Sequence, residues 1–298
     1  MKKLAHAALM LSGLLLSIKG AFAAQPVDWQ LGLQPAATDM MRQIREFEHY
    51  TMWFIVPITL FVLALLIYVC VKFKASANPT PSKTTHNTSI EVVWTLGPIL
   101  ILLAIAVPSF NILTQQLAPE EEPQLTIKAT GYQWYWGYEY QTEGEVSFDS
   151  LMLQESDRAT YGKENVAEYP RLLAVDNDIV VPVDTMVRLT VTAADVIHAF
   201  AMPAFGIKID AIPGRLNETW FKAEKEGLYY GQCSELCGKD HAYMPIGIRV
   251  VSNEQYNTWL AAAADDLESA NEALMASVAT GEKAVQLAAS EAQKDRGR

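Results

Sequence analysis

The stretch Cys233-Ser-Glu-Leu-Cys237-Gly-Lys-Asp-His241-Ala-Tyr-Met244 gathers two thiols, an imidazole and a thioether within twelve residues. Soft sulfur donors beside imidazole are typical of copper sites, whereas Mg²⁺ and Ca²⁺ prefer oxygen donors. An apolar run at 228–230 precedes the stretch, and a second run at 246–251 follows it. Both runs have the composition of β-strands, so we expect two rigid strands to hold the loop.

A further histidine, His198, lies 35 residues before Cys233, at the end of another strand-like run. One loop that carries most of the ligands, together with one distant histidine, is the arrangement of copper sites on β-sandwich proteins. The sequence therefore predicts a metal site on an all-β domain.

The two cysteines of the loop allow several interpretations. A disulfide between Cys233 and Cys237 is one, since exported thiols usually oxidise. A structural zinc site with two cysteines and two histidines is another, but it is complete without Met244. A blue copper site uses a single cysteine, whereas two thiolates four residues apart can bridge two copper ions. The binuclear copper interpretation is therefore favoured.

Two apolar segments, residues 51–71 and 92–113, are long enough to span a bilayer as helices and carry no formal charge. Their prolines are tolerated better in membrane helices than in soluble ones. The connecting segment, residues 72–91, carries three lysines, which indicates the cytoplasmic side. The topology expected is a helical hairpin with both of its flanks outside.

The N-terminus has the pattern of a secretory signal peptide over residues 1–23. Two lysines precede an apolar core, and Ala21-Phe22-Ala23 precedes the expected cleavage point. Export of the N-terminus agrees with the hairpin orientation and leaves residues 24–50 as an outer segment.

Residues 114–267 are predicted to form one outer domain. Alternating apolar and polar residues at 125–130 and 187–192 indicate strands, and turn residues separate several shorter runs. Many short strands at this spacing indicate a sandwich or barrel. Ser252-Asn-Glu-Gln255 has the form of a capping box that opens a helix reaching about residue 267. Residues 268–298 are rich in alanine, serine and charge, with too few bulky apolar residues for a core, and we expect a mobile or partly helical tail there.

The outer segment is strongly acidic. From residue 115 to residue 260 there are 22 acidic and 11 basic residues, in a chain whose formal net charge is −11. An acidic surface favours a basic partner through steering that weakens with salt. Nucleic acid is not an expected partner, because it would require a basic face.

The aromatic run Gly131-Tyr-Gln-Trp-Tyr-Trp-Gly-Tyr138 has two interpretations. It is either an aromatic strand packed in a sandwich core or near the membrane surface, or an exposed electron relay and docking platform beside the copper loop. The presence of the loop is what makes the second interpretation worth testing.

The chain resembles subunit II of the haem–copper cytochrome c oxidases of bacteria and mitochondria over about residues 40–262. Three motifs carry the resemblance: Gly131-Tyr-Gln-Trp-Tyr-Trp136, Asp210-Ala-Ile-Pro-Gly-Arg215, and Tyr230-Gly-Gln-Cys-Ser-Glu-Leu-Cys-Gly-Lys-Asp-His241 followed by Met244-Pro245. The resemblance implies a mixed membrane and all-β chain, in which a two-helix transmembrane hairpin precedes a cupredoxin-like β-sandwich that holds the binuclear CuA centre. Tyr132 departs from the pattern, since many members carry histidine there.

By this resemblance six residues would hold two copper ions: His198, Cys233, Glu235 through its backbone carbonyl, Cys237, His241 and Met244. The two thiolates would bridge the coppers. His198 and Met244 would complete one copper, and His241 with the Glu235 carbonyl would complete the other. The carboxylate of Glu235 would also bind Mg²⁺ or Mn²⁺ shared with the catalytic subunit.

The resemblance implies further roles outside the copper loop. Trp134 would be the residue through which electrons enter from cytochrome c. The acidic docking face would include Glu139, Asp149 and Asp195, complementary to a lysine-rich donor. Glu91, at the start of the second membrane helix, would lie at the mouth of a proton path into the catalytic subunit.

The function implied is that of the electron-accepting subunit of a proton-pumping terminal oxidase in the bacterial inner (cell) membrane, with the copper domain on the periplasmic side. Its partners would be cytochrome c, catalytic subunit I and the other oxidase subunits. Oxygen would be reduced in the catalytic subunit, because the predicted membrane helices of this chain carry no histidine cluster that could bind haem. The electron donor would be a separate protein, because the Cys-x-x-Cys-His motif for haem attachment is absent. A quinol oxidase subunit would lack the copper ligands. Nitrous oxide reductase would need an additional copper domain, and a copper chaperone would exchange its metal with a chelator.

Overall fold

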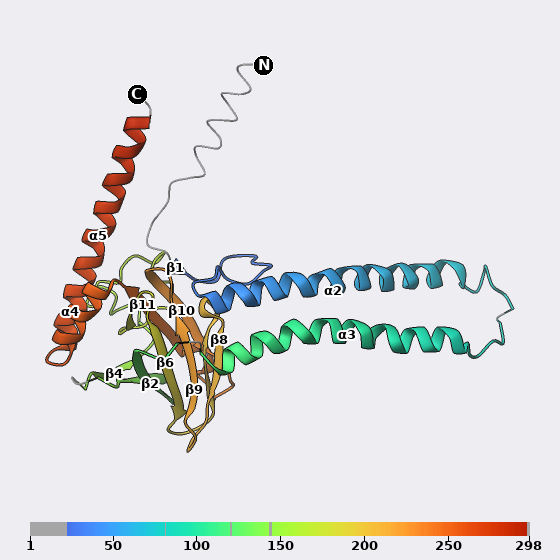
Figure 1. Cartoon of the computed structure of the whole chain (residues 1–298), viewed down its shortest axis with the longest axis horizontal. Helices are drawn as coiled ribbons and strands as arrows, with labels where there is room; N and C mark the ends of the chain where they lie inside the picture. The colour runs from blue at the N-terminus through green and yellow to red at the C-terminus, as the bar shows by residue number, and fades with distance from the viewer. Residues whose placement is uncertain (1–22, 81, 120, 143–144, 297–298) are drawn as a thin grey trace. The chain divides into compact units, whose positions relative to one another are not determined.

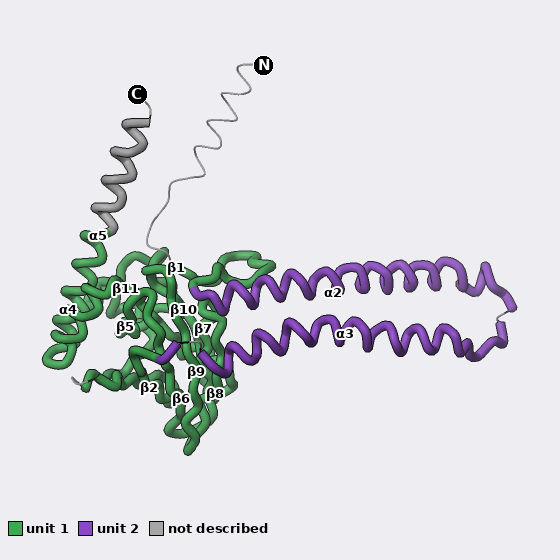
Figure 2. Tube along the Cα trace, in the orientation of Figure 1, with its two compact units in different colours: residues 1–37, 123–298 green, residues 38–122 purple. Residues whose placement is uncertain are grey.

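The computed structural model describes residues 23–80, 82–119, 121–142 and 145–296, with side chains as far as residue 281. The chain divides into two compact units, residues 1–37 with 123–298 and residues 38–122 (Figure 2). The predicted signal peptide lies outside the described residues except for its last residue.

Residues 38–122 form a unit of two long helices, α2 (Asp39–Lys72) and α3 (Thr88–Leu117), which lie side by side (Figure 1). Both helices are long and apolar enough to cross a membrane. The hydroxyl of Tyr50 on α2 donates a hydrogen bond to the Ala104 carbonyl on α3 at 3.1 Å. The unit is the expected hairpin of two apolar helices.

Both helices are longer than the apolar spans predicted at 51–71 and 92–113, because polar residues cap them further upstream. The Thr38 hydroxyl and the Asn87 side-chain oxygen each accept a hydrogen bond from the backbone N–H three residues later, at 3.1 Å and 3.3 Å. Such caps satisfy free N–H groups of the first turn. Hydropathy marks the apolar part of a helix, whereas these caps mark where it begins.

The other unit is a sandwich of two sheets. The first sheet has the strand order β5 (Ile179–Pro182), β11 (Pro245–Val251), β10 (Gly227–Cys233), β7 (His198–Met202) and β8 (Ile207–Ala211), with the short β1 (Ala23–Ala24) pairing in parallel with β10. The second has the order β4 (Ser147–Ser150), β3 (Tyr135–Tyr140), β2 (Leu125–Tyr132), β6 (Met186–Ala193) and β9 (Asn217–Lys222). The sandwich is the predicted cupredoxin-like domain.

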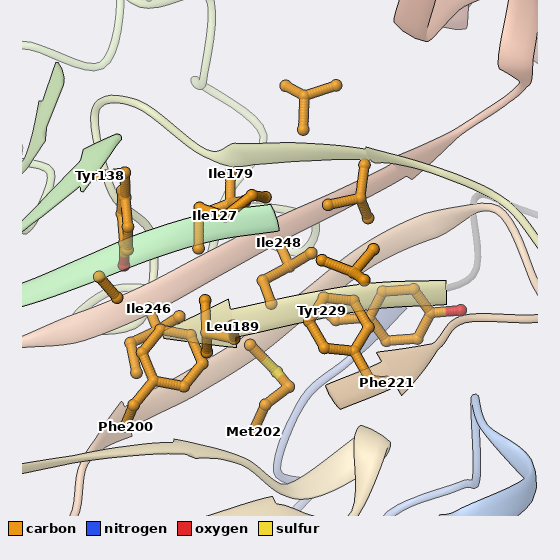
Figure 3. Packing of buried hydrophobic residues seen from close by; sticks show 14 of the residues in the cluster. Ile127, Tyr138, Ile179, Leu189, Phe200, Met202, Phe221, Tyr229, Ile246 and Ile248 are labelled. Atoms are coloured by element: carbon orange, nitrogen blue, oxygen red, sulfur yellow. The ribbon is translucent and has the colours of Figure 1, made fainter. Parts of the chain in front are cut away.

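Apolar side chains of the two sheets meet in one core (Figure 3). Ile127 and Leu189 come from the second sheet, and Phe200 and Ile248 come from the first; all four are fully buried. The indole of Trp136 on β3 packs edge-on against Phe200, with ring centroids 5.4 Å apart. Each such side chain contributes about 1.5–3 kcal/mol by leaving water. The aromatic run is therefore partly core, as one of its two interpretations predicted.

Two helices follow the sandwich, α4 (Asn253–Ala263) and α5 (Leu267–Arg296). The capping box predicted at Ser252 and Gln255 opens α4. The chain turns after α4, and the Asp266 carboxylate accepts hydrogen bonds from the backbone N–H and hydroxyl of Ser269 at the start of α5. Two helices therefore stand where one, reaching about residue 267, was expected.

A helix stands where a mobile or partly helical tail was expected at 268–298, but its first turns pack against the domain, which was not expected. Ala270 and Leu274, one turn apart on α5, are 1% and 4% exposed and belong to the sandwich core. The Asn271 side chain between them accepts a hydrogen bond from the Trp259 indole at 2.8 Å. Composition suggested too little apolar surface for packing, but two apolar residues spaced by four on one helix face are enough to dock the first turns.

Leu274→Ala is expected to lower the free energy of unfolding by about 2–4 kcal/mol, because it removes buried methyl groups from a packed contact. The control Glu272→Ala, exposed on the same helix, should change it by less than about 0.5 kcal/mol. Urea unfolding of the full-length chain in detergent, followed by tryptophan fluorescence, measures both. Equal stability of the two variants would contradict the docking of α5.

Candidate metal centre

The loop that carries most of the predicted ligands is closed by a pair of adjacent strands. Cys233 is the last residue of β10, and Met244 directly precedes β11. The two strands pair in antiparallel register from Gly227 opposite Val250 to Gln232 opposite Pro245. The backbone N–H of Cys233 donates to the Met244 carbonyl at 3.0 Å, so both ends of the loop are fixed.

The distant histidine comes from β7, which pairs with the other edge of β10. Cys233 lies opposite Phe200 in this register, two residues after His198. Gly231 makes the pairing possible, because a Cβ there would overlap the Ala201 carbonyl oxygen. His198 is fully buried beside the loop as a result.

Four side chains and one backbone carbonyl converge at this point. The Cys233 sulfur lies 3.9 Å from His198 Nδ1, 3.9 Å from the Cys237 sulfur and 3.4 Å from the Glu235 carbonyl oxygen. The Cys237 sulfur lies 3.5 Å from His241 Nδ1. The ligand atoms of His198, Cys233 and Cys237 all lie within 4.8 Å of one another. Two sulfurs and two imidazoles thus face one small volume.

Met244 and the Glu235 carboxylate are the remaining predicted metal ligands. Met244 is 1% exposed and close enough for its backbone to bond Cys233, while the Glu235 side chain is exposed. Cys233 and Cys237 are free thiols, so the structure holds the loop without the disulfide considered from the sequence. Soft sulfur with imidazole is a donor set that fits copper, and the loop presents it preassembled.

Asp195 orients the buried imidazole of His198 through Nε2, the ring nitrogen that does not face the sulfurs. Its carboxylate lies 2.8 Å from His198 Nε2 and accepts hydrogen bonds from the backbone N–H groups of Val196 at 2.6 Å and Gln133 at 2.7 Å. Burial alone would raise the pKa of Asp195, but the bonds from His198, Val196 and Gln133 outweigh it and lower that pKa. An anionic carboxylate on Nε2 turns Nδ1 toward the sulfurs, as metal-binding histidines require.

The two thiols differ in acidity. Burial alone raises the pKa of both, but at Cys233 the hydrogen bonds with His198 and with the Glu235 and Ala199 backbone together outweigh burial and lower the pKa. At Cys237 burial and the neighbouring Cys233 charge both raise the pKa. For His198, burial alone would lower the pKa, whereas the contacts with Cys233 and Asp195 raise it. The Cys233 thiol therefore loses its proton more readily than the Cys237 thiol.

Trp134 lies against the loop. Its indole N–H donates to the Cys237 carbonyl at 3.3 Å, and the Gln133 side chain donates to the same oxygen at 2.8 Å. Gly238 lies under the indole with φ at +130°, and a Cβ there would approach the ring to 2.9 Å. The predicted electron-accepting tryptophan is thus hydrogen-bonded directly to the backbone of Cys237, a candidate copper ligand.

The other predicted site residues have contacts with residues outside the ligand cluster. Glu139 is exposed and forms an ion pair with Lys128 at 2.9 Å, and Asp149 is exposed on β4. Glu91 lies in the first turn of α3, where its carboxylate accepts a hydrogen bond from the Asn87 N–H at 3.0 Å. The acids predicted to dock a partner therefore differ: Asp195 is engaged with the metal site, while Glu139 and Asp149 face solvent.

Two functional positions were missed by sequence reasoning. Gln133 and Gly238 hold Trp134 against the loop, yet neither residue type signals chemistry. The only hint was their place inside two of the three motifs that carry the family resemblance. Their role depends on contact between segments 105 residues apart.

Comparison with known proteins identifies the family. The family model described as cytochrome c oxidase subunit II, periplasmic domain, matches residues 125–251, and that of the transmembrane domain matches residues 26–112. A probable cytochrome c oxidase subunit 2 of Rickettsia bellii is 49% identical over 253 residues, which are 84% of this chain and 90% of the relative. This chain belongs to the cytochrome c oxidase subunit II family.

Plant and bacterial relatives are similarly close. Cytochrome c oxidase subunit 2 of Zea mays is 45% identical over 243 residues, which are 80% of this chain and 90% of the relative. The crystallised periplasmic domain of subunit II of cytochrome oxidase from Bradyrhizobium japonicum is 58% identical, covers 49% of this chain and 98% of its own, and superposes with a TM-score of 0.44.

Membership confirms the predicted family and fold, and the cluster of His198, Cys233 and Cys237 is a CuA-like site within it. Members of the subunit II family are parts of an oxidase whose catalytic activity lies in another subunit. Two apolar helices make the chain a membrane protein with a C-terminal domain.

Copper uptake by the full-length chain is expected to strengthen as the pH rises from about 6 to about 8. The thiolate is the form that binds metal, and the raised pKa of Cys237 means that its proton must leave. The raised pKa of His198 acts in the same direction. Titration calorimetry in buffers of different ionisation heat counts the protons released. Binding without proton release would contradict these protonation states.

Proposed function

We propose that this chain accepts electrons from cytochrome c through a binuclear CuA centre and passes them to haem in catalytic subunit I. That subunit reduces oxygen to water and pumps protons. The observation that carries the proposal is the convergence of His198, Cys233 and Cys237, with ligand atoms within 4.8 Å. A disulfide would need no imidazole beside the two sulfurs, and a mononuclear blue copper site would use two histidines with only one cysteine.

Each candidate ligand has a proposed place in a site for two copper ions. Cys233 and Cys237 would hold both ions as thiolates, while His241 and the Glu235 carbonyl would be ligands of one ion and the buried His198 a ligand of the other. Met244 completes the His198 side. Copper held there supplies one-electron redox chemistry. Strands β10 and β11 fix both ends of the loop, so that little moves when the charge changes.

The carboxylate of Glu235 has a second proposed role. Its side chain is exposed while its carbonyl oxygen faces the Cys233 sulfur. A hard cation such as Mg²⁺ or Mn²⁺ prefers carboxylate oxygen, so Glu235 would contribute to a metal shared with the catalytic subunit.

Electrons enter at Trp134, because its indole is part of the surface and bonds the Cys237 carbonyl. A lysine-rich cytochrome c would be drawn to the carboxylates around it, of which Glu139 and Asp149 are exposed. Asp195 contributes negative charge to the same face while it orients His198.

The membrane unit anchors the domain and contacts the catalytic subunit. Residues 72–91 face the cytoplasm because of their lysines, which leaves the copper domain on the periplasmic side of the bacterial inner membrane. Cleavage after residue 23 would remove the signal peptide and leave residues 24–50 as the outer N-terminal segment. Glu91 then stands at the cytoplasmic end of α3, where it gives protons a route into the catalytic subunit.

The test is electron paramagnetic resonance and copper stoichiometry of the copper-loaded, full-length chain. Two coppers that share one unpaired electron are expected. Cys233→Ser or Cys237→Ser should abolish this spectrum, because a bridge needs both thiolates, while Cys70→Ser on α2 should preserve it. One copper with a mononuclear spectrum, or a binuclear spectrum that survives either loop substitution, would refute the centre.

Glu91→Gln is expected to slow proton-coupled turnover of the assembled oxidase about tenfold, because the amide cannot release a proton. The variant keeps an oxygen that accepts the Asn87 N–H, so the start of α3 stays capped. The copper spectrum serves as the internal control and should not change. Turnover equal to that of the unmodified complex would remove Glu91 from the proton path.

A further inference from the structure

We propose that Lys239 is a specificity-determining residue, which caps the indole of Trp134 with a displaceable positive charge and so limits binding of cationic electron donors. The inference rests on the proposed function, since it concerns the surface through which electrons would enter. Nothing in the ligand set requires a cation at this position of the loop.

The geometry places the ammonium over the ring. Lys239 Nζ lies 5.4 Å from the centroid of the Trp134 ring, within the range of a cation–π contact. The indole itself cannot move away, because its N–H bonds the Cys237 carbonyl and Gly238 lies directly beneath it. Trp134 is therefore fixed between the loop and the lysine.

The lysine, in contrast, is free to swing. Its side chain is 77% exposed, and it also forms an ion pair with the half-buried Asp240 at 3.5 Å. Cation–π contacts and ion pairs are weak where water reaches both partners. A docking partner can therefore displace the ammonium at little cost and uncover the ring.

The surrounding charges give this cation its effect. On the second sheet Lys128 and Glu139 compensate each other at 2.9 Å, and Asp149 stands exposed on the strand paired with β3. The carboxylate of Asp195 is occupied by His198 and two backbone N–H groups. A lysine-rich donor is thus attracted to the periphery of the face but meets a like charge at the indole, where contact must be closest.

The consequence is that a cationic donor associates quickly, binds with low affinity and dissociates quickly. Like charge at the centre lowers affinity, and its effect falls with salt because the site is exposed. A residue that only packed against Trp134 would act in the same way at every ionic strength. Salt dependence therefore separates the electrostatic role from a structural one.

The experiment measures cytochrome c oxidation by the assembled oxidase carrying Lys239→Gln, across ionic strength. With a lysine-rich cytochrome c we expect kcat/KM to rise about two- to threefold at low salt, through KM rather than kcat, and the gain to vanish at high salt. With the same cytochrome c after acetylation of its lysines, the gain should disappear. Asp240→Asn, which leaves the lysine in place, should shift kcat/KM in the opposite direction.

Two controls keep the outcome interpretable. Reduction of the copper centre by a small uncharged reductant and the copper spectrum should be the same in Lys239→Gln and the unmodified complex. An unchanged kcat/KM at low salt, or a change that persists at high salt, would overturn the role of Lys239. Trp134→Phe tests the underlying assumption separately. If it too leaves electron transfer from cytochrome c unchanged, the route through Trp134 fails and not merely the lysine.

Discussion

Strands β7 and β10 can pair because residue 231 is glycine. Any side chain there would overlap the carbonyl oxygen of Ala201, and a backbone atom in a paired strand cannot move aside as a side chain would. This pairing sets Cys233 opposite Phe200 and brings His198 to the sulfur from a distant part of the chain. The arrangement of the candidate metal ligands therefore depends first on how closely the backbones of β7 and β10 approach each other.

A second backbone constraint joins the cluster to the protein surface. The Cys237 carbonyl accepts hydrogen bonds from both Gln133 and Trp134. The aromatic run is therefore hydrogen-bonded to the ligand loop at the second cysteine. Gly238 permits the contact by leaving room for the indole. Asp195 adds a third link, because it bonds Gln133 on one side and His198 on the other. The surface and the buried ligands therefore form one connected network.

Sequence reasoning succeeded where chemistry is concentrated in local runs and failed where it depends on tertiary contact. The loop from Cys233 to Met244, the strand-like alternation and the apolar spans were readable, since composition and spacing alone define them. The docking of α5 was not, because Ala270 and Leu274 look unremarkable until the core they enter is known. Asp195 was assigned to a surface by resemblance, and its bond to His198 emerges from the fold.

Strand β11 shows how the domain handles buried charge at two places. Away from the loop, Arg249 and Lys163 are both buried and share the Asp178 carboxylate at 3.2 Å and 3.1 Å, while Lys163 also donates to the Val175 carbonyl at 2.8 Å. Burial lowers the pKa of Lys163, so these short bonds to oxygen are what keep its charge inside. At the loop end the facing groups are thiols and imidazoles separated by 3.5–3.9 Å, with the Glu235 carbonyl oxygen 3.4 Å from the Cys233 sulfur, and thiols form only weak hydrogen bonds at such distances. The first arrangement is complete as a hydrogen-bonded structure, whereas the second gains its full stabilisation from a metal that binds all of its donors at once.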